Sequence, residues 1–323
     1  MTTLITGASG FVGSAVAASA QGRVLALGRD PQRCAATAER LGIPVTSLDL
    51  AGPDATEVLI RLAKAAGVQR IVHAAAFSAP WGKPVAFHRA NVMGTQTILR
   101  VAEAIGVSRV VHISTPAVHF RFADQEGVTE MAALPPPINP YAASKRLAED
   151  MALIAGCVVL RPRGVYGARD RALIPRLLQA LRAGPLPLLR NGVAATDLTH
   201  IDDVVASIWA GLAVAKAQGR VINISGGTAL PIRDVVEAIA QRCGSRARWQ
   251  RLPLPLAMAA AHAMELSAAW TGKEPRITRF GLGFFAYRQT LDLSQAKTVL
   301  GWQPKVGFDE GLERTFAADK SWR

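Results

Sequence analysis

The chain has 323 residues, half of them hydrophobic, which is enough for one large α/β domain and a smaller lobe. Its formal net charge of +13 comes mostly from dispersed arginines, without the clustering and interleaved aromatic side chains of a nucleic-acid surface, so we expect no nucleic-acid partner. Attraction to anionic substrates or to an anionic lipid surface stays open.

Short apolar runs alternate with helical patterns over the first half of the chain. We predict strands at 3–6, 23–27, 45–48, 70–75, 109–114 and 157–160, with helices between them, for example at 55–66 and 85–105. Strands that are separated by helices pair in parallel through right-handed crossovers. The predicted fold class is therefore α/β, with a doubly wound parallel sheet of the Rossmann type.

The regular alternation ends near Gly164. Prolines interrupt the pattern beyond this residue, and only 220–224 is typical of a further core strand. We therefore expect a sheet domain over 1–163 and a lobe over 164–323. The chain of the lobe should cross back to the sheet at about 197–228.

A glycine-rich turn follows the first predicted strand directly. Gly7 permits the turn, Gly10 lets a pyrophosphate approach the backbone, and Gly13 allows the next helix to pack closely on the strand. The amides at the start of that helix, from about Phe11, favour anionic phosphates. A second strand follows within one βαβ length, so the pattern predicts a nucleotide-binding domain.

Tyr141 and Lys145 place a phenol and an ammonium on one face of a predicted helix, because residues four apart share a helix face. A proton donor with a cationic neighbour, in a chain that binds a nucleotide, indicates hydride chemistry on a carbonyl or an alcohol. Ser114 and Thr115 end a predicted strand at the carboxyl edge of the sheet, where such sheets bind their ligands.

These motifs resemble those of the extended short-chain dehydrogenases/reductases, within the NAD-dependent epimerase/dehydratase superfamily. The resemblance covers nearly the whole chain, and the motifs occur in the family's order. They are the glycine turn, Asp49-Leu50, the stretches 73–76 and 91–95, Ser114-Thr115, Tyr141 with Lys145, and the stretches 161–167, 202–204 and 296–304.

The resemblance implies a role for each of these residues. Tyr141 would be the general acid in reduction and the base in oxidation, and Lys145 would lower the phenol's pKa and bind the cofactor ribose. Thr115 matches the family's catalytic hydroxyl, and Ser114, one residue earlier, is the alternative candidate. The expected cofactor-binding residues are Gly7, Ser9, Gly10, Phe11, Val12, Gly13, Arg29, Asp49, Leu50, Ala74, Ala75, Ala76, Asn91, Ser114, Tyr141, Lys145, Pro162, Gly164 and Val165.

The end of the second predicted strand bears on the choice of cofactor. Arg29 can bind a 2′-phosphate through charge-assisted hydrogen bonds, and Arg33 follows nearby. Asp30 could instead turn toward the ribose 2′-hydroxyl, which would favour NAD(H). We favour NADP(H), with NAD(H) as the alternative.

The substrate is less well determined by the sequence. Pro116 and Ala117 stand where sugar-nucleotide dehydratases carry an acidic pair, which disfavours dehydration. The nearly apolar stretch 252–266 resembles the 3β-hydroxysteroid dehydrogenase-like branch, as do 274–278 and 291–294. This stretch could line an apolar pocket, rest on a membrane surface or be buried in the lobe, and it is too short and interrupted to span a membrane.

We therefore predict an NADP(H)-preferring oxidoreductase that interconverts a ketone and a secondary alcohol on a hydrophobic substrate, such as a 3-oxoacid, a steroid or a sterol. The alternatives are a nucleotide-sugar 4-epimerase and a non-catalytic NAD(P)-sensing protein. Asp197 and His200 should tie the lobe to the sheet. Arginines of the lobe could hold a substrate carboxylate, namely Arg163, Arg169, Arg171 and Arg190.

The remaining expectations concern compartment and partners. Three scattered cysteines without metal-ligand spacing favour a cytoplasmic protein with no metal site. No charged segment with an apolar core precedes the first strand, so we expect no signal peptide. Peripheral membrane contact stays open, and the family resemblance suggests a homodimer, for which the helix at 92–105 is a candidate face.

Overall fold

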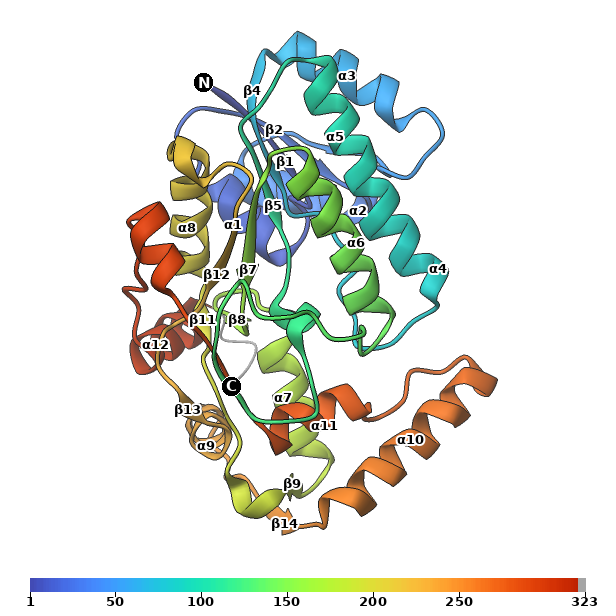
Figure 1. The fold of residues 1–323 in the computed structure, drawn as a ribbon, viewed down its shortest axis with the longest axis vertical. Coiled ribbons are helices and arrows are strands. Elements are labelled where there is room, and N and C mark those ends of the chain that lie inside the picture. Colours follow the sequence, from blue (N-terminus) through green and yellow to red (C-terminus); the bar gives the residue numbers. More distant parts are fainter. Residues whose placement is uncertain (319–323) are drawn as a thin grey trace.

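A parallel sheet forms the centre of the computed structural model, which describes residues 1–318 (Figure 1). Within these residues the sheet has seven strands in the order β12-β7-β5-β4-β1-β2-β3. This confirms the predicted α/β fold class. The strands are β1 (Thr2–Thr6), β2 (Arg23–Gly28), β3 (Val45–Ser47), β4 (Val68–His73), β5 (Val110–Ile113), β7 (Val158–Pro162) and β12 (Val221–Ile224).

Both faces of this sheet are covered by helices. Leu4 and Ile5 are adjacent in β1 and fully buried, and because successive strand residues point to opposite faces, each packs into a different core. The core around Ile5 includes α1 (Phe11–Ala18) and α8 (Ile201–Ala213). The core around Leu4 includes α3 (Ala55–Ala66), α5 (Gly94–Ala104) and α6 (Pro140–Ile154).

Two predicted elements have different bounds in the structure. The helix expected at 85–105 consists of α4 (Pro84–Phe87), a π-helical turn (His88–Met93) and α5. The strand expected to reach residue 75 ends at His73, because the backbone amide of Ala75 donates to the hydroxyl of Thr6 (3.2 Å) instead of to a neighbouring strand.

A lobe lies beyond the carboxyl edge of the sheet and is seen below it in Figure 1. Its short strands were not predicted, because two to four residues are too few to show a period. Its helices are α7 (Leu173–Ala183), α9 (Ile232–Arg242), α10 (Leu254–Thr271), α11 (Arg279–Ala286) and α12 (Phe308–Ala318). Its strands are β6 (Gln125–Val128), β8 (Val165–Tyr166), β9 (Leu186–Leu188), β10 (Ala195–Thr196), β11 (Thr199–His200), β13 (Leu230–Pro231), β14 (Trp249–Arg251) and β15 (Arg288–Leu291).

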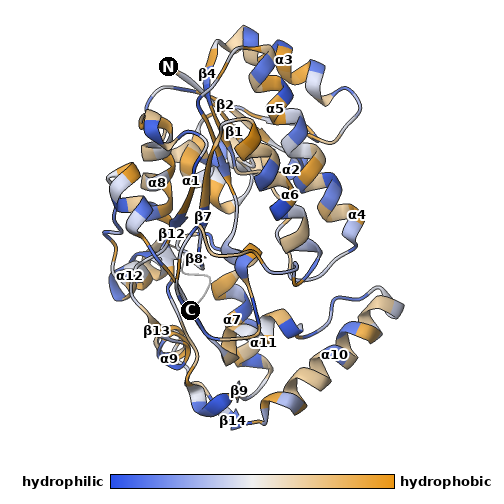
Figure 2. Ribbon diagram, viewed as in Figure 1, coloured by the Kyte–Doolittle hydropathy of each residue, from blue (hydrophilic) through white to orange (hydrophobic). Residues whose placement is uncertain are grey.

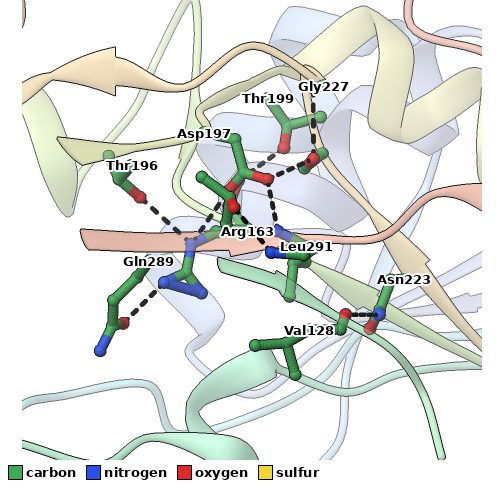
Figure 3. A network of polar contacts seen from close by, with 12 residues as sticks. Val128, Arg163, Thr196, Asp197, Thr199, Asn223, Gly227, Gln289 and Leu291 are labelled. Carbon is green, nitrogen blue, oxygen red and sulfur yellow. Dashed lines mark hydrogen bonds and ion pairs between the residues drawn. The ribbon is translucent and has the colours of Figure 1, made fainter. Parts of the chain in front are cut away.

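Asp197 ties this lobe to the sheet, as predicted (Figure 3). Its carboxylate pairs with Nε of Arg163 (3.0 Å), directly after β7, and accepts from the hydroxyl of Ser225 (2.7 Å), directly after β12. It also accepts from the amide of Leu291 in β15 (2.8 Å). Burial raises the pKa of Asp197, and Arg163 opposes that shift. His200 has a more local role, because its ring accepts the amide of Asp202 at the start of α8.

Candidate active site

The glycine turn after β1 is tightly packed and leaves the N-terminus of α1 without a side-chain cap. Gly7 has a φ of 70°, and a Cβ at this position would lie 2.7 Å from the carbonyl oxygen of Ala74. A Cβ on Gly13 would collide with the carbonyl oxygen of Gly7. Gly10 caps α1 without a side chain, so the first-turn amides of that helix face outward without competition from one. These features fit the pyrophosphate of a dinucleotide.

The charged side chains at the end of β2, Arg29 and Asp30, make different contacts. The carboxylate of Asp30 accepts the backbone amide of Arg33 (2.8 Å) and thereby caps α2 (Pro31–Leu41). Arg29 is exposed, and its charge acts on Asp49, which also accepts from Arg89 (2.8 Å). Burial raises the pKa of Asp49, but these cations and the amide of Ala51 outweigh burial and lower it.

Tyr141 lies in the first turn of α6, with its phenol between two hydroxyl groups. The side-chain hydroxyls of Ser78 and Thr115 lie close enough to the phenol to influence its pKa. Burial raises the pKa of Tyr141, and the two hydroxyls only partly oppose that shift. The direction differs from the one expected from Lys145, because burial dominates. Ser78 was not among the predicted residues, since its approach to Tyr141 depends on the pairing of β4 with β5.

Lys145 is buried one turn further along α6, with 2 % of its surface exposed. Its Nζ donates to the carbonyl oxygen of Ile113 (2.6 Å) and lies 3.3 Å from Nε2 of His112. Burial lowers the pKa of Lys145 to about 8, opposed by the charge of Glu149. Burial and Lys145 together hold the pKa of His112 well below its usual value, so its neutral ring accepts from the ammonium.

Ser114 and Thr115 are adjacent, but they belong to different surroundings. The hydroxyl of Ser114 donates to the carboxylate of Glu149 (2.5 Å), which pairs with the buried guanidinium of Arg161. Arg161 in turn donates to Nε2 of His119 (2.5 Å). Thr115 instead approaches Tyr141 and accepts the amide of Ala117 (3.2 Å). Of the two candidates, only Thr115 is brought to the phenol.

Several other predicted cofactor residues line the same edge of the sheet. Ala74, Ala75 and Ala76 follow β4, while Pro162 ends β7 and Val165 begins β8. Gly164, with a φ of 50°, makes the turn between those two strands.

Two predicted cofactor residues are engaged in packing the protein itself. Asn91 is 1 % exposed, and its side chain exchanges hydrogen bonds with the backbone of Phe77 (2.7 and 3.2 Å) and donates to Ser144 (2.9 Å). Leu50 is buried in the core around Leu4, and its backbone carbonyl accepts a hydrogen bond from the hydroxyl of Thr97 (2.7 Å). The Asn91 contacts hold the loop that carries Ser78 against α6.

Aromatic rings flank the phenol and continue into the lobe. Phe87 lies 6.2 Å from Tyr141 between ring centroids and packs on Phe77 at 4.6 Å. Phe120, in the segment that follows Thr115, packs on Phe280 of α11 at 4.9 Å and on Phe122 at 5.3 Å.

The four arginines suggested for a substrate carboxylate are not brought together. Arg163 pairs with Asp197, and Arg190 makes a two-pronged ion pair with Asp124 (2.7 and 2.8 Å). Arg169 and Arg171 are exposed and interact electrostatically with arginines of α2 instead. Ion pairs therefore occupy two of the four candidate side chains. Within residues 1–318 no group of acidic, histidine or cysteine side chains is arranged to hold a metal ion.

The sequence matches the NAD dependent epimerase/dehydratase family over residues 3–225. The chain belongs to this family. It is 30 % identical to the 2-alkyl-3-oxoalkanoate reductase of Stenotrophomonas maltophilia, over 98 % of this chain and 99 % of the relative. It is 29 % identical to the decarboxylating sterol-4-alpha-carboxylate 3-dehydrogenase of Saccharomyces cerevisiae, over 83 % and 81 %.

Solved structures of the epimerase/dehydratase family have the same fold. A UDP-glucuronic acid 4-epimerase from Bacillus cereus, in complex with UDP-glucuronic acid and NAD, superposes with a TM-score of 0.76 at 25 % identity, over 100 % of both chains. The family and these relatives identify an NAD(P)-dependent oxidoreductase that acts on a CH–OH group. The predicted resemblance to extended short-chain dehydrogenases/reductases is confirmed.

The apolar stretch predicted at 252–266 belongs to the longer helix α10, which extends away from the lobe (Figure 1). Figure 2 shows it coloured largely toward the hydrophobic end of the scale. Leu256, Leu266 and Trp270 are 61 %, 53 % and 91 % exposed, so the helix is not buried in the lobe. Within residues 1–318 no helix has both the length and the hydrophobicity needed to cross a membrane.

Proposed function

We propose that the chain is an NADP(H)-preferring oxidoreductase that interconverts a ketone and a secondary alcohol on a hydrophobic substrate. The observation that carries the proposal is the phenol of Tyr141, which lies near Thr115 and beside the ring of Phe87 at the carboxyl edge of the sheet. The reductase and sterol dehydrogenase relatives support the same substrate class.

A bound nicotinamide cofactor supplies or accepts the hydride. In the reducing direction Tyr141 donates its proton to the substrate oxygen, and Thr115 donates a hydrogen bond to the same oxygen. The raised pKa of Tyr141 keeps the phenol protonated at neutral pH, which supports its role as the acid. Lys145 contributes a buried positive charge on the same helix, and it stays largely protonated below its pKa of about 8.

Three arginines of the lobe are engaged in ion pairs, which supports a hydrophobic substrate over a nucleotide sugar at their positions. A sugar diphosphate needs free cations, but Arg163, Arg190 and Arg288 pair with Asp197, Asp124 and Glu126, respectively. The fold similarity to a UDP-glucuronic acid 4-epimerase keeps epimerisation as the second candidate.

The test is to incubate the purified protein with NADPH or NADH and with long-chain 2-alkyl-3-oxoacids, oxosteroids or UDP-sugars. Cofactor absorbance and product identity are followed together. We expect net NADPH consumption with a hydrophobic ketone. Conversion of a UDP-sugar to its epimer, with no net change in cofactor, would replace this proposal by the epimerase.

The preference for NADP(H) is supported at the end of β2. Asp30 is engaged as the cap of α2, which leaves Arg29 and Arg33 as the charges near a bound ribose. We expect a lower dissociation constant for NADPH than for NADH, measured by titrating the protein and following the fluorescence of the reduced cofactor. Equal constants would contradict the preference.

We also propose that α10 rests on an anionic lipid surface. Apart from His262, its exposed side chains between Leu256 and Trp270 are apolar or small, and its acidic residue Glu265 is neutralised by Arg279 (2.7 Å). Exposed cations flank both ends, Arg251 before the helix and Lys273 after it. A helix of this kind binds at the lipid interface through its apolar face, with electrostatic support.

A homodimer through the helices that flank the sheet completes the proposal. The outer face of α5 is mostly polar, but the neighbouring α6 exposes Leu147 (50 %) and Ile154 (88 %). Light scattering coupled to size exclusion should give the mass of a dimer for the native chain and of a monomer for Ile154→Glu. A native monomer would contradict this arrangement.

A further inference from the structure

His112 makes a contact with Lys145 that the proposed reaction does not use. It lies on β5, between β4 and β7, with 1 % of its surface exposed. Its Nε2 is 3.3 Å from Nζ of Lys145, which lies on α6. An ammonium group can only donate hydrogen bonds, so Nε2 is the acceptor and the proton of the neutral ring lies on Nδ1. The contact therefore fixes the tautomer of His112.

The fold leaves this ring proton unpaired. Nδ1 of His112 is buried and has no hydrogen-bond partner within residues 1–318. An unpaired buried donor destabilises a fold, and an apolar side chain of similar size would avoid that loss. Burial and the charge of Lys145 hold the pKa of His112 well below its usual value, so the ring is not charged either. The acceptor atom that faces Lys145 is the feature of this ring that explains its presence.

The neighbouring His73 restricts how the ring of His112 can lie. The two residues are paired in register on β4 and β5, and their ring centroids are 5.2 Å apart. The two ring nitrogens of His73 hydrogen-bond to Thr6 of β1 (2.8 Å) and Thr95 of α5 (3.0 Å). His112 thus packs against a ring that is itself held on two sides, which gives its Nε2 a fixed place beneath α6.

The ammonium of Lys145 has three protons, and two of them have acceptors on β5. Nζ donates to the carbonyl oxygen of Ile113 (2.6 Å) and to Nε2 of His112 (3.3 Å). Glu149, one turn further along α6, does not compete for the ammonium, because its carboxylate is bound by Arg161. Two neighbouring acceptors on one strand define the direction of the third N–H bond.

Four titratable groups surround Lys145: His73 on β4, His112 on β5, and Tyr141 and Glu149 on α6. Burial and Lys145 lower the pKa of His73 to about 3, so both histidines are neutral at physiological pH. Burial raises the pKa of Tyr141, which keeps the phenol protonated. Glu149 is the negative charge among the four, and it favours the ammonium form of Lys145.

We propose that His112 is a positioning residue for Lys145: its Nε2 accepts one N–H of the ammonium, the carbonyl oxygen of Ile113 accepts another, and the third is left for the cofactor ribose. The inference rests on the proposed function, in which Lys145 is the buried cation of the active site. Loss of the acceptor on His112 should make the ammonium both less stable and less well placed.

The test compares two variants of His112 with a matched control. His112→Leu removes the acceptor at similar volume, whereas His112→Gln supplies an amide oxygen that can accept in its place. His200→Leu is the control, since His200 is 3 % exposed and precedes α8, which covers the opposite face of the sheet. Each chain is prepared with and without Lys145→Met.

The first measurement is the free energy of unfolding of the cofactor-free protein across neutral and alkaline pH. Relative to its Lys145→Met partner, the native chain should begin to gain stability near pH 8, the pKa of Lys145 in the fold. For His112→Leu the gain should begin about one pH unit lower, because the ammonium loses a hydrogen bond that stabilises its charge. His112→Gln should return the onset toward the native pH, and the control should keep it there.

The second measurement follows the loaded protein. With a ketone substrate, the alkaline fall of kcat should shift by the same interval in His112→Leu. The dissociation constants of NADH and NADPH should rise together, by about 3- to 10-fold, because the ribose that Lys145 would bind is common to both. His112→Gln should recover both properties.

The third measurement needs no variant. Nitrogen-15 spectra of the native chain, with His112 assigned through its backbone signals, should show the Nδ1–H tautomer at neutral pH. An Nε2–H tautomer would overturn the assignment. So would a uniform loss of stability in His112→Leu with the onset still near pH 8, because the ring would then serve packing alone. If no ketone is reduced, the proposed function fails, whereas the cofactor-free measurements still decide the role of His112.

Discussion

The polar network beneath α6 and the outer face of α10 depart in opposite ways from the usual distribution of side chains. In the first, Lys145, Glu149 and Arg161 are charged and at most 2 % exposed. In the second, Leu256 and Trp270 are apolar and 61 % and 91 % exposed. Charged groups are buried only when paired, whereas exposed apolar patches mark contact surfaces.

The two regions differ in whether their unusual side chains have partners inside the fold. Each charge beneath α6 has a partner within the fold: Arg161 pairs with Glu149, and Lys145 donates to Ile113. The exposed side chains of α10 face solvent on the side opposite to buried Ala257 and Ala261. The first region is explained by folding and by the site above it. The second is explained by the lipid contact that we propose for α10.

Replacing Tyr141 by Phe should have the largest effect. It removes the proton donor but keeps the ring that packs on Phe87, so kcat should fall by about 10²- to 10⁴-fold while the melting temperature changes little. The adjacent hydroxyls sharpen the test. Thr115→Val should lower kcat, whereas Ser114→Ala should mainly lower stability, because Ser114 faces Glu149. A Ser114 variant with the larger kinetic defect would reverse the assignment.

Breaking the buried ion pair should have the next largest effect. Glu149→Gln leaves the guanidinium of Arg161 without a counter-charge inside the protein, and we expect a loss of about 3–5 kcal/mol in the free energy of unfolding, measured in urea. Glu126→Gln is the matched control, since it breaks the exposed pair with Arg288 and should change the free energy of unfolding far less. Equal losses would mean that the buried ion pair contributes no more to the free energy of unfolding than the exposed ion pair does.

The pH dependence of Lys145 gives the third test. Its pKa in the fold, about 8, lies below that of a free lysine, so between these values the unfolded chain binds more protons. The free energy of unfolding should therefore rise with pH in this range, by at most about 1.4 kcal/mol per unit, relative to Lys145→Met. Activity should fall over the same range as the ammonium loses its charge. Parallel pH curves for the two proteins would contradict the shifted pKa.

The predictable parts of this site are those set by local sequence. The spacing of Gly7, Gly10 and Gly13 after an apolar strand, and of Tyr141 and Lys145 along a helix, follows from backbone geometry alone. The parallel sheet follows from the alternation of strands and helices. Each of these patterns is contained within about thirty residues, the length of a βαβ unit.

The unpredicted parts depend on contacts between distant segments. Ser78 and Tyr141 lie on the segments that follow β4 and β5, and these strands pair with each other. The amide of Gly127 donates to the hydroxyl of Thr290, 163 residues away. The sequence did not show whether Ser114 or Thr115 faces Tyr141. A shift of one residue along a strand moves every side chain to the opposite face of the sheet. The carboxylates that pair with arginines also lie far away in the sequence. The positive net charge therefore did not show that Arg163 is neutralised.

Removing the apolar face of α10 should have the smallest effect on folding. Leu256, Leu266 and Trp270 are more than half exposed, so Leu256→Ser, Leu266→Ser and Trp270→Ser should each change the free energy of unfolding by no more than about 0.5 kcal/mol. Co-sedimentation with vesicles that contain anionic phospholipid should nevertheless decrease strongly in the triple variant. Met131→Ser is the control, since Met131 is 90 % exposed outside α10. Native co-sedimentation by the triple variant would exclude α10 as the lipid contact, and a large loss of stability would mean that these side chains are buried within an assembly of copies of the chain.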